Sequence, residues 1–469
     1  MASIVASLQR IKDDPLGVLG RDGIERVCNE HGRVWRERRL DPATTVGLFV
    51  HQIVHGNVPC SEVRHLAAAA PEGGGGGRSF TPQAYCDARA RLPLAVYQDL
   101  LGAVNDCLMP QTRRDAHLWH GHRTFHVDGS TFSMPDTPEL RKAFGTASGQ
   151  QPGCGFPVAH LLVLFSAATG LLVDAWASPL RTGDLAQTPE AHVHLDPGDV
   201  LIGDDTFSGY PHLASLVRQG LHGLFPVHHL RILDFAKGRP HNVEGAKDAV
   251  KGRPTSRWIR SLGKEDQLVE YVKPRSRPAW MTREAYDALP ASITVRELRR
   301  TVTRPGLGHV TIAMTTTLLD PLAYPADALL ELRLRRWDVE TNLRHLKTTM
   351  GLDVLHCKTE QGVRKRSRIR RLPGDELAVF ALVYNLVRAV MLEAAARQGV
   401  PVSRISFADA YKWLRHARPG DVLQPLIVNP SRPHRIEPRC RKRRPKQYDL
   451  MNKPRSTLRK LLKNKRNRA

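Results

Sequence analysis

The sequence has little that would place it in a membrane or an oxidising compartment. Its seven cysteines are scattered and form no Cys-x2-Cys pair, so neither a disulfide framework nor a cysteine metal site is expected. No apolar run approaches the roughly 18 residues that a membrane-spanning helix needs, and residues 1–15 lack a signal-peptide core. We therefore expect a cytoplasmic protein with reduced, mostly buried thiols.

Acidic residues are scarce relative to basic ones. The chain has 70 Lys and Arg against 46 Asp and Glu, which gives a net charge of +24 over 469 residues. Such an excess favours a polyanionic partner, and nucleic acid is the usual one. A cationic membrane-surface protein is the alternative, but no basic amphipathic segment with bulky apolar flanks is present. The length predicts two or three domains, and a composition of 41% hydrophobic and 25% charged residues is typical of a soluble globular protein.

The pattern of the chain changes near residue 124. Residues 1–115 predict several helices around a flexible glycine-rich loop at 71–78. Two roles fit this helical segment equally well, namely binding of DNA ends and structural capping. Three strand patterns then precede a helix, a strand, a helix and a strand, which predicts a ribonuclease H-like α/β sheet. The strand patterns lie at 125–132, 157–170, 171–178, 199–207 and 221–228.

Two strongly basic segments follow this predicted sheet. Residues 229–317 are polar and rich in Pro and Arg, with short strand patterns at 267–272, 293–298 and 310–317. These patterns predict a β-rich segment. From Ser431 onward, 16 basic residues face two acidic ones. We expect this tail to stay disordered or to fold only on a partner, and to bind phosphates in a salt-sensitive way.

The stretch Leu332–Met350 has the apolar spacing of one amphipathic helix. On such a helix, Arg336, Glu340 and Lys347 fall within roughly 40° of one another. A carboxylate between two cations is unusual on a helix that only packs. The alternative is a solvated charged face stabilised by pairs four residues apart.

Two aspartates end strand-like apolar runs, Asp128 in VDGS and Asp204 in GDD. With Glu340 they provide three carboxylates on separate elements, which suggests a phosphoryl-transfer site for two ions, Mg²⁺ or Mn²⁺. Asp205 is the alternative to Asp204, because successive strand residues face opposite sides. Asp338 is the alternative to Glu340, but it lies about 160° around the helix.

The helix from Leu332 resembles the Tyr-x2-Arg-x3-Glu-x6-Lys signature of DDE transposases of the insertion-sequence-four group. Arg336, Glu340 and Lys347 match with both spacings intact, whereas Arg333 replaces the tyrosine. VDGST and LIGDDTFSGY resemble the other two catalytic blocks of that family. With RRPKQYDLMNKPR near the C-terminus, the resemblance spans roughly residues 80–455.

This resemblance implies a bacterial, nucleoid-associated DNA transposase that performs cut-and-paste transposition at terminal inverted repeats. Asp128, Asp204 and Glu340 would be catalytic and bind the metal, and Arg336, Lys347 and Arg333 would contact DNA. A homodimer is expected in the DNA complex. The implied division is a helical N-terminal domain (1–115), a ribonuclease H-like core (116–228 and 318–400), a β-rich insertion (229–317) and a C-terminal region with the basic tail (401–469). The insertion would contact DNA or only support the fold.

Two further functions are compatible with the sequence. One is that of a catalytically inactive DNA-binding relative, and the second is that of a nuclease that cleaves without strand transfer. A group of histidines just before the first predicted strand also suggests a zinc site. They lack a further ligand group at the spacing of such a site, so surface or DNA-proximal positions are favoured. These residues are His117, His120, His122 and His126.

Overall fold

The computed structural model describes nine segments of the chain. They are residues 19–32, 39–68, 80–147, 153–243, 247–304, 308–366, 371–416, 423–428 and 453–466. The glycine-rich loop predicted at 71–78 and residues 431–452 of the basic tail lie outside the described residues.

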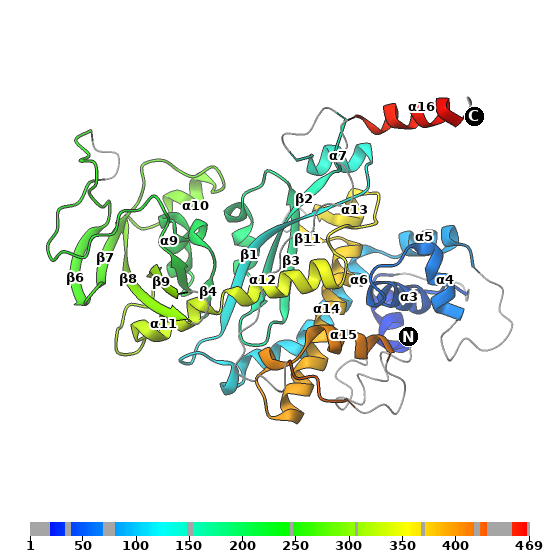
Figure 1. Ribbon diagram of the computed structural model, residues 1–469, viewed down its shortest axis with the longest axis horizontal. Coiled ribbons are helices and arrows are strands. Elements are labelled where there is room, and N and C mark those ends of the chain that lie inside the picture. Colours follow the sequence, from blue (N-terminus) through cyan, green and yellow to red (C-terminus); the bar gives the residue numbers. More distant parts are fainter. Residues whose placement is uncertain are drawn as a thin grey trace.

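One mixed sheet of nine strands runs through the molecule, in the order β3-β2-β1-β4-β5-β9-β8-β7-β6 (Figure 1). Its first three strands in sequence pair antiparallel, β4 pairs parallel with β1, and β5 pairs parallel with β4. This arrangement confirms the predicted ribonuclease H-like α/β fold. The strands are β1 (Thr124–Ser133), β2 (Val158–Ser166), β3 (Leu172–Pro179), β4 (Val200–Ile202) and β5 (His222–Pro226).

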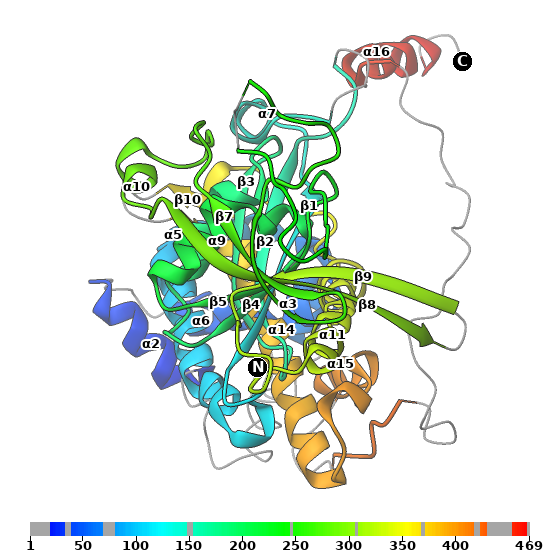
Figure 2. The ribbon, with the colours of Figure 1, turned by 90° about the vertical axis from the view of Figure 1, so that its left-hand side faces the viewer.

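The strands of residues 229–317 extend this same sheet, because β9 pairs antiparallel with β5. They are β6 (Arg257–Gly263), β7 (Asp266–Val272), β8 (Ser292–Arg304) and β9 (Gly308–Thr316). The sequence indicated β7 to β9 but not β6, whose residues are mostly exposed and show no regular apolar alternation. The far ends of β8 and β9 project from the body as a two-stranded ribbon (Figure 2).

The 24-residue helix α14 (Asp375–Gln398) is the centre of the largest hydrophobic core. By length and composition it is the one described helix that could span a membrane, but 83% of its apolar window is buried inside the protein. N-terminal residues such as Phe49 and Tyr97 share this core with α14. This shared core is what a structural cap on the catalytic core would show. Binding of DNA ends by the N-terminal helices stays a prediction. The N-terminal helices are α2 (Arg21–Glu30), α3 (Pro42–Val54), α4 (Cys60–Ala68), α5 (Pro82–Arg91) and α6 (Leu94–Leu108).

The remaining helices are short and lie between strands or near the C-terminus. They are α7 (Pro138–Phe144), α8 (Thr188–His192), α9 (Tyr210–Arg218), α10 (Arg283–Asp287), α13 (Glu360–Val363), α15 (Phe407–His416) and α16 (Arg455–Arg466). The prediction of a tail without structure is wrong for α16. Its apolar residues have helical spacing, and Arg455 at its start lies 3.2 Å from Asp136 and stacks over Phe156.

The prediction of one helix over Leu332–Met350 is wrong in detail. The structure has α11 (Ala326–Leu334), a turn at Arg335–Arg336, α12 (Trp337–Arg344) and a π-helical turn (His345–Thr349). At the break, the Arg336 amide donates to the Arg333 carbonyl three residues back, at 3.1 Å, which tightens the chain locally. The turn and the π-helical turn both depend on packing against other segments, so the apolar spacing of the sequence alone does not reveal them.

Candidate active site

Asp128 and Asp204 meet at one edge of the sheet, where β1 and β4 run parallel. His126 is paired with Ile202 across these strands, and each aspartate follows two residues later. Asp204 lies just after β4, and its carboxylate accepts a hydrogen bond of 2.9 Å from the Thr206 amide at the start of a 3-10 turn. The parallel register therefore brings together two carboxylates that are 76 positions apart in the sequence.

The glycine before Asp204 lets this turn close against the strand. A Cβ built on Gly203 would lie 2.6 Å from the Phe207 ring and 3.1 Å from Val127 Cγ1. Any larger residue would push the turn, and with it the Asp204 carboxylate, away from β1. The Gly-Asp order of this motif thus has a steric cause.

Arg336 connects the aspartate on β1 to the glutamate on α12. Its Nη2 lies 3.2 Å from Asp128 Oδ1, and its Nη1 lies 3.3 Å from Glu340 Oε1. Side-chain exposure falls from 48% at Glu340 to 12% at Asp128, so the guanidinium joins an exposed carboxylate to a buried one. One cationic side chain thus touches two of the three predicted metal ligands.

Burial gives Asp128 and Asp204 unusual acidities. Burial is the largest cause that raises the pKa of Asp128 to about 6, and the charge of Asp204 adds to it, although Arg336 opposes the shift. Burial also raises the pKa of Asp204. Buried carboxylates that repel one another are stabilised by a cation. The oxygen donors therefore fit hard divalent ions.

Arg333, which replaces the signature tyrosine, lies close enough to the aspartates to feel their charge. Burial, followed by repulsion from Arg336, lowers its pKa to about 10, while Asp204 and Asp128 counteract this effect. Its Nε is buried and has no hydrogen-bond partner. This arrangement leaves a buried donor available near the carboxylates.

Lys347 lies in the π-helical turn that follows α12 and reaches back to β1. Its Nζ donates a 3.0 Å hydrogen bond to Ser130 Oγ and lies 3.3 Å from Asp353 Oδ1. Ser130 is two residues beyond Asp128, on the same face of the strand. Arg336 and Lys347 therefore flank the carboxylates from both ends of α12.

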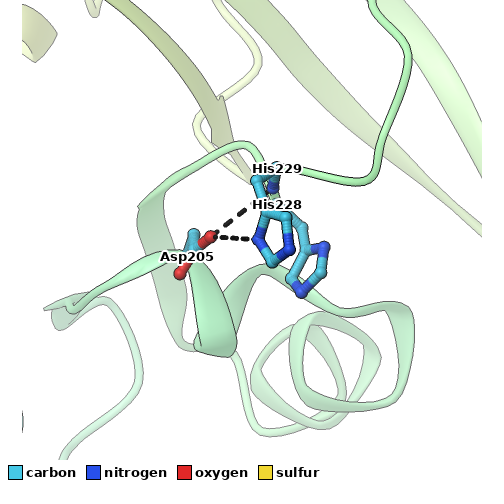
Figure 3. A group of neighbouring side chains, drawn as sticks. All are labelled: Asp205, His228 and His229. Carbon is cyan, nitrogen blue, oxygen red and sulfur yellow. Dashed lines mark hydrogen bonds and ion pairs between the residues drawn. The ribbon is translucent and has the colours of Figure 1, made fainter.

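Asp205, the alternative to Asp204, points to a different group of side chains. His229 contacts its Oδ2 through both its backbone amide (3.4 Å) and its ring Nδ1 (3.1 Å) (Figure 3). Burial alone would raise the pKa of Asp205, but the hydrogen bonds from His229 and the charges of His228 and His229 lower this pKa. Asp204 instead shares the surroundings of Asp128, which favours it as the second ligand.

Asp205, His228 and His229 form a group whose ligand atoms are close enough together to hold a metal ion. One atom each of Asp205, His228 and His229 lies within 4.8 Å of the others. However, His228 Nδ1 accepts a hydrogen bond of 3.2 Å from the Leu230 amide, which places the ring proton on Nε2. This tautomer leaves His228 without a free lone pair, so the group is a poor metal site as it stands.

Asp338 lies apart from this centre, as do His117, His120 and His122 before β1, whereas His126 lies in β1 itself, two residues before Asp128. Asp338 interacts with Arg335 and with Arg388 of α14, not with the aspartates. Among the described residues, the four histidines do not converge on one point as metal ligands would. His122, for example, contacts the Gly198 carbonyl and the Tyr324 hydroxyl, at 2.6 and 2.7 Å.

Sequence reasoning missed one carboxylate near the site, Asp184. Its charge acts on both Asp128 and Asp204 and contributes to the raised pKa of each. It lies in a polar segment after β3 that has no apolar periodicity, so no local signal in the sequence pointed to it.

The raised pKa of Asp128 predicts that protons compete with divalent ions. The folded-state pKa of Asp128, about 6, exceeds the ordinary value of 3.8. Without metal, Asp128 therefore contributes to the free energy of unfolding below pH 4, where it is protonated, and this contribution is lost as the pH rises through 6. Conversely, Mn²⁺ affinity should fall about tenfold per pH unit below 6. Calorimetric titrations at pH 5, 6 and 7 test this. An affinity that does not change with pH, or an equal dependence in Asp128→Asn, would contradict the assignment.

Comparison with known proteins agrees with this geometry. The chain is 25% identical over 456 residues to the transposase InsG for insertion sequence element IS4 of Escherichia coli (strain K12), covering 91% of this chain and 90% of InsG. It is also 25% identical to the putative transposase InsZ of the same organism, over 41% of this chain and 63% of InsZ. Residues 119–372, more than half of the chain, match the family described as the transposase DDE domain. The chain therefore belongs to the DDE transposases, in the group of insertion sequence IS4.

Proposed function

We propose that this transposase cuts both ends of an insertion sequence at terminal inverted repeats and joins the released 3′-hydroxyls to target DNA. Asp128, Asp204 and Glu340 would hold two divalent ions, Mg²⁺ or Mn²⁺. Such ions activate an oxygen nucleophile and stabilise charge on the phosphate. Arg336, helped by Lys347, would bind the phosphates of the DNA end.

One observation carries this proposal. Arg336 contacts Asp128 and Glu340 at once, at 3.2 and 3.3 Å, while Asp204 follows β4 beside them. Carboxylates from three elements thus converge around a cation on a basic protein, as a site for metal ions and phosphates requires. Arg336 forms bidentate contacts more readily than Lys347, which acts as a point charge.

A strand-transfer assay tests the reaction. The full chain would be incubated with a duplex that carries the terminal repeat from DNA flanking its gene, a supercoiled target plasmid, and Mg²⁺ or Mn²⁺. We expect nicks that leave a 3′-hydroxyl at the repeat, followed by joined products, and neither in EDTA. Cleavage without joining would indicate a nuclease, and binding without cleavage an inactive relative. Either result would contradict the proposal.

Two chains are expected to act together, one on each end of the element. In this proposal, a complex with end DNA contains two protein chains and two duplexes. Light scattering of the purified complex measures this stoichiometry. A complex of a single chain that still joins both ends would contradict a homodimer.

The basic tail is expected to add affinity for DNA without sequence preference. Removing residues 431–469 deletes 16 basic and two acidic residues. Non-specific affinity should therefore fall, and its dependence on salt should flatten, because fewer counterions are released on binding. Anisotropy titrations at several salt concentrations measure both. Metal-dependent nicking at low salt should persist, whereas an unchanged salt slope would show that the tail does not contact DNA.

A further inference from the structure

Two buried histidines meet beside the turn that follows Asp204. This 3-10 turn, η5 (Asp205–Ser208), has Asp204 as its N-cap residue and leads into α9. His192, at the end of α8, and His212, in α9, are only 6% and 0% exposed. Their Nε2 atoms lie 3.1 Å apart, within hydrogen-bond distance. The pair thus joins two helices next to the second aspartate of the site.

The hydrogen bonds around this pair fix which ring nitrogens carry protons. His212 Nδ1 lies 2.7 Å from the Phe207 carbonyl, which can only accept, so Nδ1 carries the proton and Nε2 of the same ring is an acceptor. At the other end, the Gln219 side-chain nitrogen donates to the Ser215 carbonyl at 2.9 Å and to His192 Nδ1 at 3.3 Å. His192 therefore has its proton on Nε2, as the contact with His212 requires. The bonds run in one direction and end at the Phe207 carbonyl.

Phe207 is held both at its carbonyl and at its ring. The carbonyl accepts the bond from His212, and the fully buried ring lies where a Cβ on Gly203 would be 2.6 Å away. The Phe207 amide lies 3.4 Å from the Asp204 carbonyl, and the Thr206 amide donates to the Asp204 carboxylate at 2.9 Å. A shift of Phe207 would therefore move the backbone that orients this carboxylate.

We propose that His212 and His192 are positioning residues of the divalent-metal site and that they act on Asp204 through the turn η5. This inference rests on the proposed function, because it concerns the same ions. His212 donates to the Phe207 carbonyl, and His192 keeps the proton of His212 on the nitrogen that faces this carbonyl. Groups that orient metal ligands contribute about ten- to a hundredfold to metal affinity.

Replacing His212 by Asn and by Gln separates positioning from packing. The amide nitrogen of Asn can take the place of histidine Nδ1, and that of Gln the place of Nε2. His212→Asn therefore keeps the donor to Phe207, whereas His212→Gln, although closer to histidine in size, loses it. We expect His212→Gln to weaken Mn²⁺ binding about tenfold and His212→Asn less than about threefold. Calorimetric titration of the full chain measures this without an activity readout, and mobility shifts in EDTA should show unchanged DNA-end binding.

At position 192 the order of the two variants should be reversed. His192 acts through Nε2, so His192→Gln keeps the donor and should bind Mn²⁺ normally, whereas His192→Asn loses the donor and should bind Mn²⁺ about threefold more weakly. A general loss of packing cannot produce opposite orders at the two positions. The matched control is His117→Gln, which removes a similar bond, from Nδ1 to the Gln111 carbonyl at 2.6 Å, and should bind Mn²⁺ normally.

Asp204→Asn is titrated in parallel, so that failure of this inference and failure of the metal site give different results. Equal Mn²⁺ affinities of His212→Asn and His212→Gln, or weaker binding by the Asn variant, together with loss of Mn²⁺ by Asp204→Asn, would overturn only this inference. If the variants at 212 do not fold, the variants at 192 decide, and equal affinities there would overturn it. Normal Mn²⁺ binding by Asp204→Asn would mean that the metal site, and with it the proposed function, is wrong.

Discussion

Asp128→Asn, Asp204→Asn and Glu340→Gln are each expected to reduce cleavage of the transposon end at least about a thousandfold. A bound ion supplies several kcal/mol of transition-state stabilisation, and each 1.36 kcal/mol corresponds to a factor of ten in rate. End binding should remain, because phosphate contacts belong to the neighbouring cations. Single-turnover cleavage with Mg²⁺ and a mobility-shift titration in EDTA measure the two quantities separately.

Asp205→Asn and Asp338→Asn are the matched controls for this experiment. Each also removes one carboxylate, but Asp205 is bound by His229 and Asp338 faces Arg335 and Arg388. Both variants should cleave at close to the normal rate. Normal cleavage by Asp204→Asn together with an inactive Asp205→Asn would reverse the assignment of the second ligand.

Lys347→Ala is expected to slow cleavage by about ten- to a hundredfold and to remain slow at high metal concentration. A charged hydrogen bond is worth roughly 1.5–3 kcal/mol, and the carboxylate ligands are unchanged in this variant. Glu340→Asp should behave in the opposite way, with a raised metal requirement that excess Mn²⁺ satisfies. Cleavage rates measured against Mn²⁺ concentration distinguish the two. Rescue of Lys347→Ala by Mn²⁺ would mean that the lysine serves the metal site.

The bond between Lys347 and Ser130 adds a control to this prediction. If the lysine acts only by holding β1, Ser130→Ala should reproduce the loss, since it removes the same 3.0 Å hydrogen bond. We expect Ser130→Ala to have a much smaller effect, because the charge that binds phosphate is retained. Equal losses in both variants would assign Lys347 a structural role.

Local patterns predicted the strands of the core well, because their apolar runs are bounded by turn residues. The short β4 is entirely buried, and its pattern continued to the aspartate that follows it. The register between β1 and β4 could not be predicted, although it decides that Asp128 and Asp204 meet. Strand β6 escaped prediction because most of its side chains are exposed.

The features that sequence reasoning missed depend on contacts between distant segments. The turn at Arg335–Arg336 interrupts a stretch whose apolar spacing is that of a continuous helix. The carboxylate of Asp184 comes close to β1 only because Gly129, on another element, leaves room for it. The spacing of Arg336, Glu340 and Lys347 correctly predicted that these side chains lie near one another, because all three belong to one local segment.

Anomalous scattering from crystals of the full chain soaked in Mn²⁺ tests the central claim most directly, since it locates the ions without reference to activity. We expect Mn²⁺ peaks among the carboxylates of Asp128, Asp204 and Glu340, with Arg336 displaced from at least one of them. Mn²⁺ found only between Asp205 and the neighbouring histidines, with Arg336 still bridging Asp128 and Glu340, would contradict it.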